Sequence, residues 1–183
     1  MNGYAAPCSR RASAGMRTLI VDGYNVIHCT PPYTHIAEQD LDSARLALIS
    51  DVAAFAHTDF RATVVFDGHG NPNSDGVAHH IAGVTVIFSR FGIDADSVIE
   101  RLSRAAREAG EDVVVVTSDA QLQWTVLGGT VARMSAGEFG GEIKAEDAEW
   151  REHAPSGSSK GRLEDRIDVA TRDQLARWAR GKE

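Results

Sequence analysis

Three apolar runs in this chain each lead into an aspartate. The acids are Asp22 after Leu19-Ile20-Val21, Asp67 after Val64-Val65-Phe66, and Asp119 after the run 113–116 and the pair Thr117-Ser118. If the runs are buried parallel strands, their carboxyl ends converge at one edge of a sheet, where open α/β sheets usually bind ligands. The spacing therefore predicts a cluster of carboxylates at that edge.

A cluster of carboxylates is unstable unless a cation neutralises it. Two carboxylates about 4 Å apart repel by roughly 4 kcal/mol at an effective dielectric constant near 20, and each further neighbour adds to this repulsion. A site made only of oxygen ligands suits Mg²⁺ or Mn²⁺, which keep several waters and are often completed by phosphate oxygens of the substrate. Phosphodiester chemistry is therefore the first functional hypothesis.

A fourth acid, Asp96, comes from the start of a predicted helix, in the step Asp94-Ala95-Asp96-Ser97. Each acid alone has an ordinary structural role as a turn or cap residue, because a carboxylate is favoured at a helix N-terminus. The coincidence of four acids at one edge favours a shared site instead. We also expect a further set of polar side chains to contact the substrate: Asn25, Arg90, Ser97 and Ser118.

The rest of the sequence predicts the strands and helices that would position these acids. Hydrophobic periodicity predicts strands at 17–22, 62–67, 84–88, 112–117 and 130–133, and helices at 40–57, 95–109, 119–127, 135–150 and 171–180. Residues 23–39, which include Pro31-Pro32, are predicted to be a loop. Alternating strands and helices with short connections predict an α/β fold with a central, mainly parallel sheet and helices on both faces.

The chain divides into three segments. Residues 1–15 carry Ala, Ser, Gly and Arg without periodicity, so we expect a disordered N-terminal extension. Residues 16–153 form the predicted α/β domain. Residues 154–183 are expected to form a linker, which contains Ser156-Gly157-Ser158-Ser159, and a C-terminal helix.

Composition narrows the class of protein. At 183 residues, with 43% hydrophobic and 25% charged residues, the chain has the make-up of one soluble globular domain. The net charge of −7 argues against a generally basic surface, so a nucleic acid would be contacted through local patches. Cys8 and Cys29 lack the spacing of a zinc site, and so few cysteines fit a reducing cytoplasm. No apolar stretch approaches the roughly 20 residues of a spanning helix, so we predict no membrane insertion.

Several of these motifs together resemble the YacP-like branch of the NYN domains, a PIN-like ribonuclease group. The segments that carry the resemblance are Val21-Asp22-Gly23-Tyr24-Asn25-Val26-Ile27, Val65-Phe66-Asp67-Gly68, Ala95-Asp96-Ser97-Val98-Ile99-Glu100 and Thr117-Ser118-Asp119. They occur in the right order between Met16 and Trp150. The resemblance implies a three-layer PIN-like fold and a metal-dependent endoribonuclease, in which Asp22, Asp67, Asp96 and Asp119 bind Mg²⁺ or Mn²⁺. Asn25 is expected to orient Asp22, or to bind a phosphate or a metal-bound water.

The resemblance also bears on the substrate. Some members of this branch are linked to ribosomes, which implies mRNA at the ribosome as a more specific target. This chain departs from the family pattern at Asp94, where a small hydroxyl residue is common, and at Val98, where an aromatic is common. Neither departure removes an expected metal ligand.

Other functional classes remain to be compared with this hypothesis. A phosphatase of the haloacid dehalogenase type needs a second acid two residues after the first, and Tyr24 occupies that position. A P-loop NTPase needs a GxxxxGK[ST] motif, which the sequence lacks. The serious alternative is a catalytically silent RNA- or ribosome-binding adaptor that keeps the fold. Structured DNA also remains open as a substrate, because PIN-like sites resemble those of flap nucleases.

Overall fold

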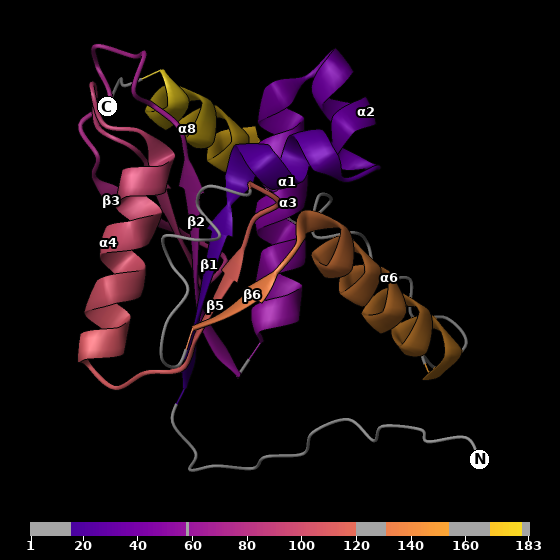
Figure 1. Cartoon of the computed structure of the whole chain (residues 1–183). Coiled ribbons are helices and arrows are strands. Elements are labelled where there is room, and N and C mark those ends of the chain that lie inside the picture. Colours follow the sequence, from indigo (N-terminus) through magenta and orange to yellow (C-terminus); the bar gives the residue numbers. More distant parts are fainter. Residues whose placement is uncertain (1–15, 58, 120–130, 154–168, 181–183) are drawn as a thin grey trace.

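The computed structural model describes residues 16–57, 59–119, 131–153 and 169–180 and shows a twisted sheet with helices on both faces (Figure 1). The sheet has the strand order β3-β4-β2-β1-β5-β6. The strands are β1 (Arg17–Asp22), β2 (Phe60–Phe66), β3 (Ala78–Ile81), β4 (Val84–Phe88), β5 (Val113–Val116) and β6 (Val131–Met134). Neighbouring strands run parallel except at the β3–β4 pair. The predicted three-layer α/β fold with a mainly parallel sheet is confirmed.

Two apolar clusters lie on opposite faces of the sheet, because successive side chains of a strand point to opposite sides. Leu19 and Val21 belong to the larger cluster, while Ile20 belongs to the smaller one. The larger cluster is covered by α1 (Gly23–Cys29), α2 (Tyr33–Gln39), α3 (Leu41–Ala56), α6 (Ala136–His153) and α8 (Val169–Ala179). The smaller cluster is covered by α4 (Ala95–Glu108), which lies across the sheet from α3 and α6 in Figure 1.

Two predicted helix starts are confirmed by their caps. The Asp40 carboxylate accepts a hydrogen bond from the backbone N–H of Asp42 at 3.1 Å and begins α3. The Asp94 carboxylate accepts from the N–H of Ser97 at 2.8 Å and begins α4. In both cases a side-chain oxygen satisfies an N–H group that has no partner within the helix.

The predicted loop at 23–39 is wrong, because α1 and α2 occupy most of it on either side of Pro31-Pro32. Each helix has seven residues, which is too short for a hydrophobic period to stand out. Strand β3 was also not predicted. It pairs with β4 across the two-residue turn Ala82-Gly83, which is a weaker hairpin signal than Asn-Gly. The predicted helix at 119–127 lies outside the described residues except for Asp119. The predicted linker at 156–159 lies wholly outside them.

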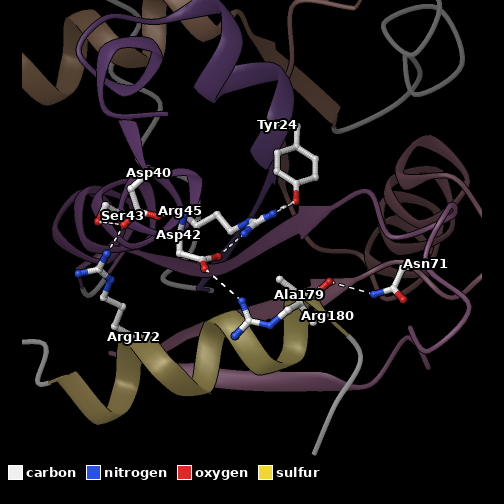
Figure 2. A network of polar contacts seen from close by, with 9 residues as sticks. All are labelled: Tyr24, Asp40, Asp42, Ser43, Arg45, Asn71, Arg172, Ala179 and Arg180. Atoms are coloured by element: carbon white, nitrogen blue, oxygen red, sulfur yellow. Dashed lines mark hydrogen bonds and ion pairs between the residues drawn. The ribbon is translucent and has the colours of Figure 1, made fainter. Parts of the chain in front are cut away.

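The C-terminal helix α8 packs onto the larger cluster beside α3. Leu175 is fully buried there, and the Trp178 ring stacks on the ring of His79 with centroids 3.8 Å apart. Figure 2 shows the polar contacts that accompany this packing. Asn71 donates a hydrogen bond from Nδ2 to the carbonyl oxygen of Ala179 at 3.0 Å. The helix is therefore held by both the core and the loop after β2.

Arg172 of α8 and Arg180, which directly follows that helix, pair with acids at the start of α3 (Figure 2). Arg172 pairs with Asp40, and Arg180 lies 3.8 Å from Asp42. Both arginine side chains are more than half exposed, so each pair adds little to stability. The described helices include none that is long and apolar enough to cross a membrane.

We predict that burial of Leu175, rather than the ion pairs, holds α8 in place. Leu175→Ala should lower the free energy of unfolding by about 2–4 kcal/mol, the usual cost of emptying a buried leucine site. Arg172→Ala, the matched control on the same helix, should lower it by less than about 1 kcal/mol. Urea denaturation of the full chain measures both. Equal losses of unfolding free energy in the two variants would contradict the prediction that burial of Leu175 holds α8 in place.

Candidate active site

Asp22 lies at the carboxyl end of the central strand β1 and caps α1. Its side chain is only 8% exposed. One carboxylate oxygen accepts from the backbone N–H of Asn25 at 3.2 Å, and the other accepts from the Thr117 hydroxyl at 3.4 Å. The carboxylate is therefore held in one orientation by groups from two neighbouring strand ends.

The turn after Asp22 is tight because α1 packs directly on the sheet. A Cβ atom at Gly23 would lie 2.4 Å from the Phe66 ring, a distance that real Cβ atoms do not adopt. A side chain at this position would push α1 away from β2. Glycine thus lets the backbone that carries Asp22 approach the strand that leads to Asp67.

The turn after β5 is tied to the turn after β1 by backbone and side-chain hydrogen bonds. The Asn25 Oδ1 atom accepts from the N–H of Ser118 at 2.7 Å. The Ser118 hydroxyl in turn accepts from the N–H of Ala136 at the start of α6, at 3.0 Å. The N–H of Asp119 donates to the Thr117 hydroxyl at 3.1 Å. Asp119 and Asp22 are thus linked through Thr117.

Asp67 directly follows β2, and its carboxylate is bound to His69. The same oxygen accepts from the His69 backbone N–H at 2.8 Å and lies 2.8 Å from the His69 Nδ1 atom. The Asp67 side chain is about one-third exposed, so this pairing occurs at the solvent edge. His69 therefore orients Asp67, a role that sequence reasoning did not single out.

Asp96 lies in the first turn of α4, after the cap residue Asp94. A carboxylate there is favoured by the positive end of the helix dipole. Ser97 donates its backbone N–H to the carboxylate of the cap residue Asp94, and both residues are exposed. Arg90 is exposed in the loop between β4 and α4.

The charges show that the four acids share one region. Burial raises the pKa of Asp22 to about 6, the N–H of Asn25 opposes this, and the Asp96 and Asp119 carboxylates raise it further. Partial desolvation also raises the pKa of Asp96, and the carboxylates of Asp119, Asp94 and Asp67 add to the shift. Each of the four predicted acids therefore interacts electrostatically with at least one of the others.

The cluster is open rather than a closed cage. Within the described ranges, no three His, Cys, Asp or Glu side chains already stand in position to ligate one ion. Mg²⁺ commonly binds proteins through one or two carboxylates, with waters and substrate phosphates filling the other positions. An open group of carboxylates fits that mode of binding, and it does not fit a tetrahedral zinc site.

Sequence reasoning missed the orienting groups more than the acids. Thr117 and His69 each hold a predicted acid, but a threonine at a strand end and a histidine in a loop give no signal of their own. Tyr24, the residue after Gly23, packs on Phe66 with ring centroids 5.1 Å apart. Its hydroxyl accepts from the Nε atom of Arg45 at 3.1 Å (Figure 2). Tyr24 is therefore part of the packing beneath α1.

A parallel sheet with acids gathered at its carboxyl edge is typical of PIN-like α/β domains. Comparison with protein families gives the particular branch, because the YacP-like NYN domain model matches residues 19–180. The chain belongs to the YacP-like NYN domain family, within the PIN-like nuclease superfamily. The matched residues include α8.

Individual relatives agree with this family. The chain is 33% identical to the YacP protein of Bacillus subtilis (strain 168) over 132 residues, which cover 70% of this chain and 76% of that protein. It is also similar to two crystal structures of Rae1 (YacP) from Bacillus subtilis. One, of a tryptophan-to-leucine mutant, has a TM-score of 0.65 at 29% identity and covers 88% of this chain and 98% of that one. The other has a TM-score of 0.63 at 30% identity and covers 91% and 96%.

We predict that Asp22→Asn stabilises the metal-free protein at neutral pH. The pKa of Asp22 rises from 3.8 to about 6 on folding. The native state then binds more protons than the unfolded chain between these values, and the free energy of unfolding falls as pH rises through this window. Asparagine keeps an oxygen that can cap α1 but carries no charge.

The stability gain should therefore depend on pH. We expect no gain below pH 3.8 and a full gain above pH 6, where the wild-type carboxylate is charged. The gain should be on the order of 2 kcal/mol, measured by urea denaturation in EDTA. Equal stability of the two proteins at pH 8 would contradict a raised pKa at Asp22.

Proposed function

We propose that this chain is a metal-dependent endoribonuclease that hydrolyses RNA phosphodiester bonds. The carboxylates that would hold Mg²⁺ or Mn²⁺ are Asp22, Asp67, Asp96 and Asp119. The observation that supports this proposal most strongly is the mutual electrostatic interaction of these acids around a buried Asp22. Such a group is costly without a cation. PIN-like nucleases generally use divalent metal ions, which is consistent with this chemistry.

In this proposal the four acids hold the metal ion, and neighbouring residues orient the acids. Asp22 is fixed by Asn25 and Thr117, so its carboxylate does not have to reorient when a cation binds. Asp119 is held to the same threonine, and His69 restrains Asp67. A bound divalent ion supplies water activation and neutralises the charge that develops on the phosphate. The products should then carry a 5′-phosphate and a 3′-hydroxyl.

Asn25 is the residue that we assign to a phosphate oxygen of the RNA. Its Oδ1 atom is used by the Ser118 N–H, which fixes the amide plane. The Nδ2 group is the donor of that amide. Ser118 therefore acts on the substrate through Asn25, whereas Ser97 and Arg90 lie on the exposed rim beside Asp96.

Metal binding itself gives the first prediction. Mn²⁺ or Mg²⁺ at about 100 times its dissociation constant should stabilise the wild type by about 2.7 kcal/mol, which raises Tm by several degrees. Asp96→Asn should lose most of this shift. Glu108→Gln is the matched control, because Glu108 is an exposed acid at the other end of the same helix. A shift of the same size in all three proteins would contradict a site at Asp96.

Cleavage tests the function directly. End-labelled single-stranded and structured RNAs should be cut by the wild type with Mn²⁺ or Mg²⁺, and not with EDTA. Asp96→Asn should reduce the rate of RNA cleavage at least about 100-fold. A metal ligand positions the positive charge of the ion, and that charge stabilises mainly the transition state. Glu108→Gln should cut at the wild-type rate. A structured DNA substrate in the same assay decides between RNA and DNA.

The family resemblance implies a more specific substrate, which is mRNA bound to the ribosome. The assay therefore includes an arm with translating ribosomes. Cutting only in that arm would make the chain a ribosome-dependent nuclease. If neither free nor ribosome-bound RNA is cut in the presence of metal, the proposal fails. The catalytically silent RNA- or ribosome-binding adaptor would then be the better description.

A further inference from the structure

A groove of about 510 Å³ lies between the loop after β2 and the loop after β4. It is lined by Pro72, Asn73, Ser74, Asp75, Arg90, Phe91 and Ile93. Phe91 is 54% exposed and Ile93 is 42% exposed, and both are large apolar side chains. Val77, two residues beyond Asp75, is 50% exposed. Of the four large hydrophobic side chains that stand exposed in the described part of the chain, two line the groove, Val77 follows one of its loops in the sequence, and the fourth is Met16.

The groove is built on a rigid frame rather than on loose loops. The N–H of Phe91 donates to the carbonyl of Ser74 at 3.0 Å, and the N–H of Gly92 donates to the carbonyl of His69 at 3.0 Å. The buried Ser74 hydroxyl donates to the carbonyl of Ser89 at 2.8 Å. These bonds join the backbone of the loop after β2 to the backbone of the loop after β4, so the two walls of the groove are tied to each other.

A glycine completes this frame. Gly76 has a φ of +78°, which L side chains rarely adopt, and a Cβ atom there would lie 3.1 Å from the Cβ of Arg90. The close approach brings the Asp75 turn against the stem of Arg90. The Asp75 carboxylate accepts from the N–H of Val77 at 2.9 Å and stabilises the same turn.

The groove and the acids leave the sheet at the same edge. Strand β4 is parallel to β2, and Phe88 pairs with Phe66, so the loop with Arg90 and Phe91 emerges beside Asp67. The loop then runs through Asp94 into α4 and its first-turn acid Asp96. An RNA strand that crosses the carboxylates can therefore place a neighbouring nucleotide in the groove.

The chemistry of the lining fits an unpaired nucleotide. An exposed aromatic ring offers a face on which a base can stack, a contact that single-stranded RNA makes readily because its bases are accessible. Arg90 supplies a positive charge for the phosphate in a protein whose net charge is −7. Asn73 and Asp75 supply a hydrogen-bond donor and acceptors suited to the polar edge of a base.

We propose that this groove is a nucleotide-binding subsite for single-stranded RNA, in which Phe91 stacks on a base next to the scissile phosphate. This inference rests on the proposed nuclease function for its substrate class. It assigns Phe91 and Arg90 as substrate-binding residues and makes unpaired RNA the preferred form.

Binding in EDTA tests the groove apart from catalysis. The probe is a fluorescein-labelled single-stranded RNA of 12 nucleotides, measured by anisotropy with the full chain. Phe91→Ala should weaken binding roughly 10-fold, while Phe91→Trp, which keeps a ring, should bind about as well as the wild type. Met16→Ala is the matched control for removing an exposed apolar side chain, and it should leave binding unchanged. A duplex of the same sequence should bind at least about 10-fold more weakly, because its bases stay paired.

The outcomes separate the groove from the nuclease function. The subsite proposal is overturned if Phe91→Ala binds RNA as well as the wild type does. It is also overturned if the duplex binds as tightly as the single strand, or if the wild type binds no RNA. If metal-dependent cutting by the wild type is unchanged in Phe91→Ala, the nuclease function stands and the groove fails. If binding follows Phe91 but the wild type cuts no RNA with metal, the groove stands and the nuclease function fails.

Discussion

Repulsion between carboxylates at one edge of the sheet is the constraint on which the rest of the site depends. Asp22 is buried at the end of β1, and its pKa is raised to about 6 by desolvation and by neighbouring acids. Folding of the metal-free chain must therefore supply free energy to keep this charge in place at neutral pH. A divalent cation would remove that cost, which links stability to the proposed chemistry.

The surrounding structure keeps the acids in position despite this repulsion. The turns after β1, β5 and β6 are joined by a chain of hydrogen bonds from Asn25 to Ser118 and from Ser118 to Ala136. The Thr30 hydroxyl extends the chain by donating to the carbonyl of Ala136 at 3.0 Å. These bonds connect turns and helices that are far apart in the sequence. Helix α3 packs against α1, and α8 packs against α3.

The strand-end acids could be predicted from sequence because short apolar runs followed by Asp are a local pattern, and the central sheet follows from their alternation with helices. The groups that orient these acids could not. Thr117 reaches Asp22 across 95 residues, and only the pairing of β1 with β5 brings them together. The helices at 23–39 were missed because seven residues and a proline pair hide their period. The burial of Leu175 depends on long-range packing, which periodicity in a short helix does not reveal.

The most direct measurement of the central claim is anomalous diffraction at the manganese edge from crystals soaked in Mn²⁺. We expect a peak among the carboxylates of Asp22, Asp67, Asp96 and Asp119, with waters completing the coordination, and we expect Asp96→Asn crystals to lose or weaken it. An ordered wild-type site with no peak at saturating Mn²⁺ would contradict the claim. The acids would then have to be explained without a metal.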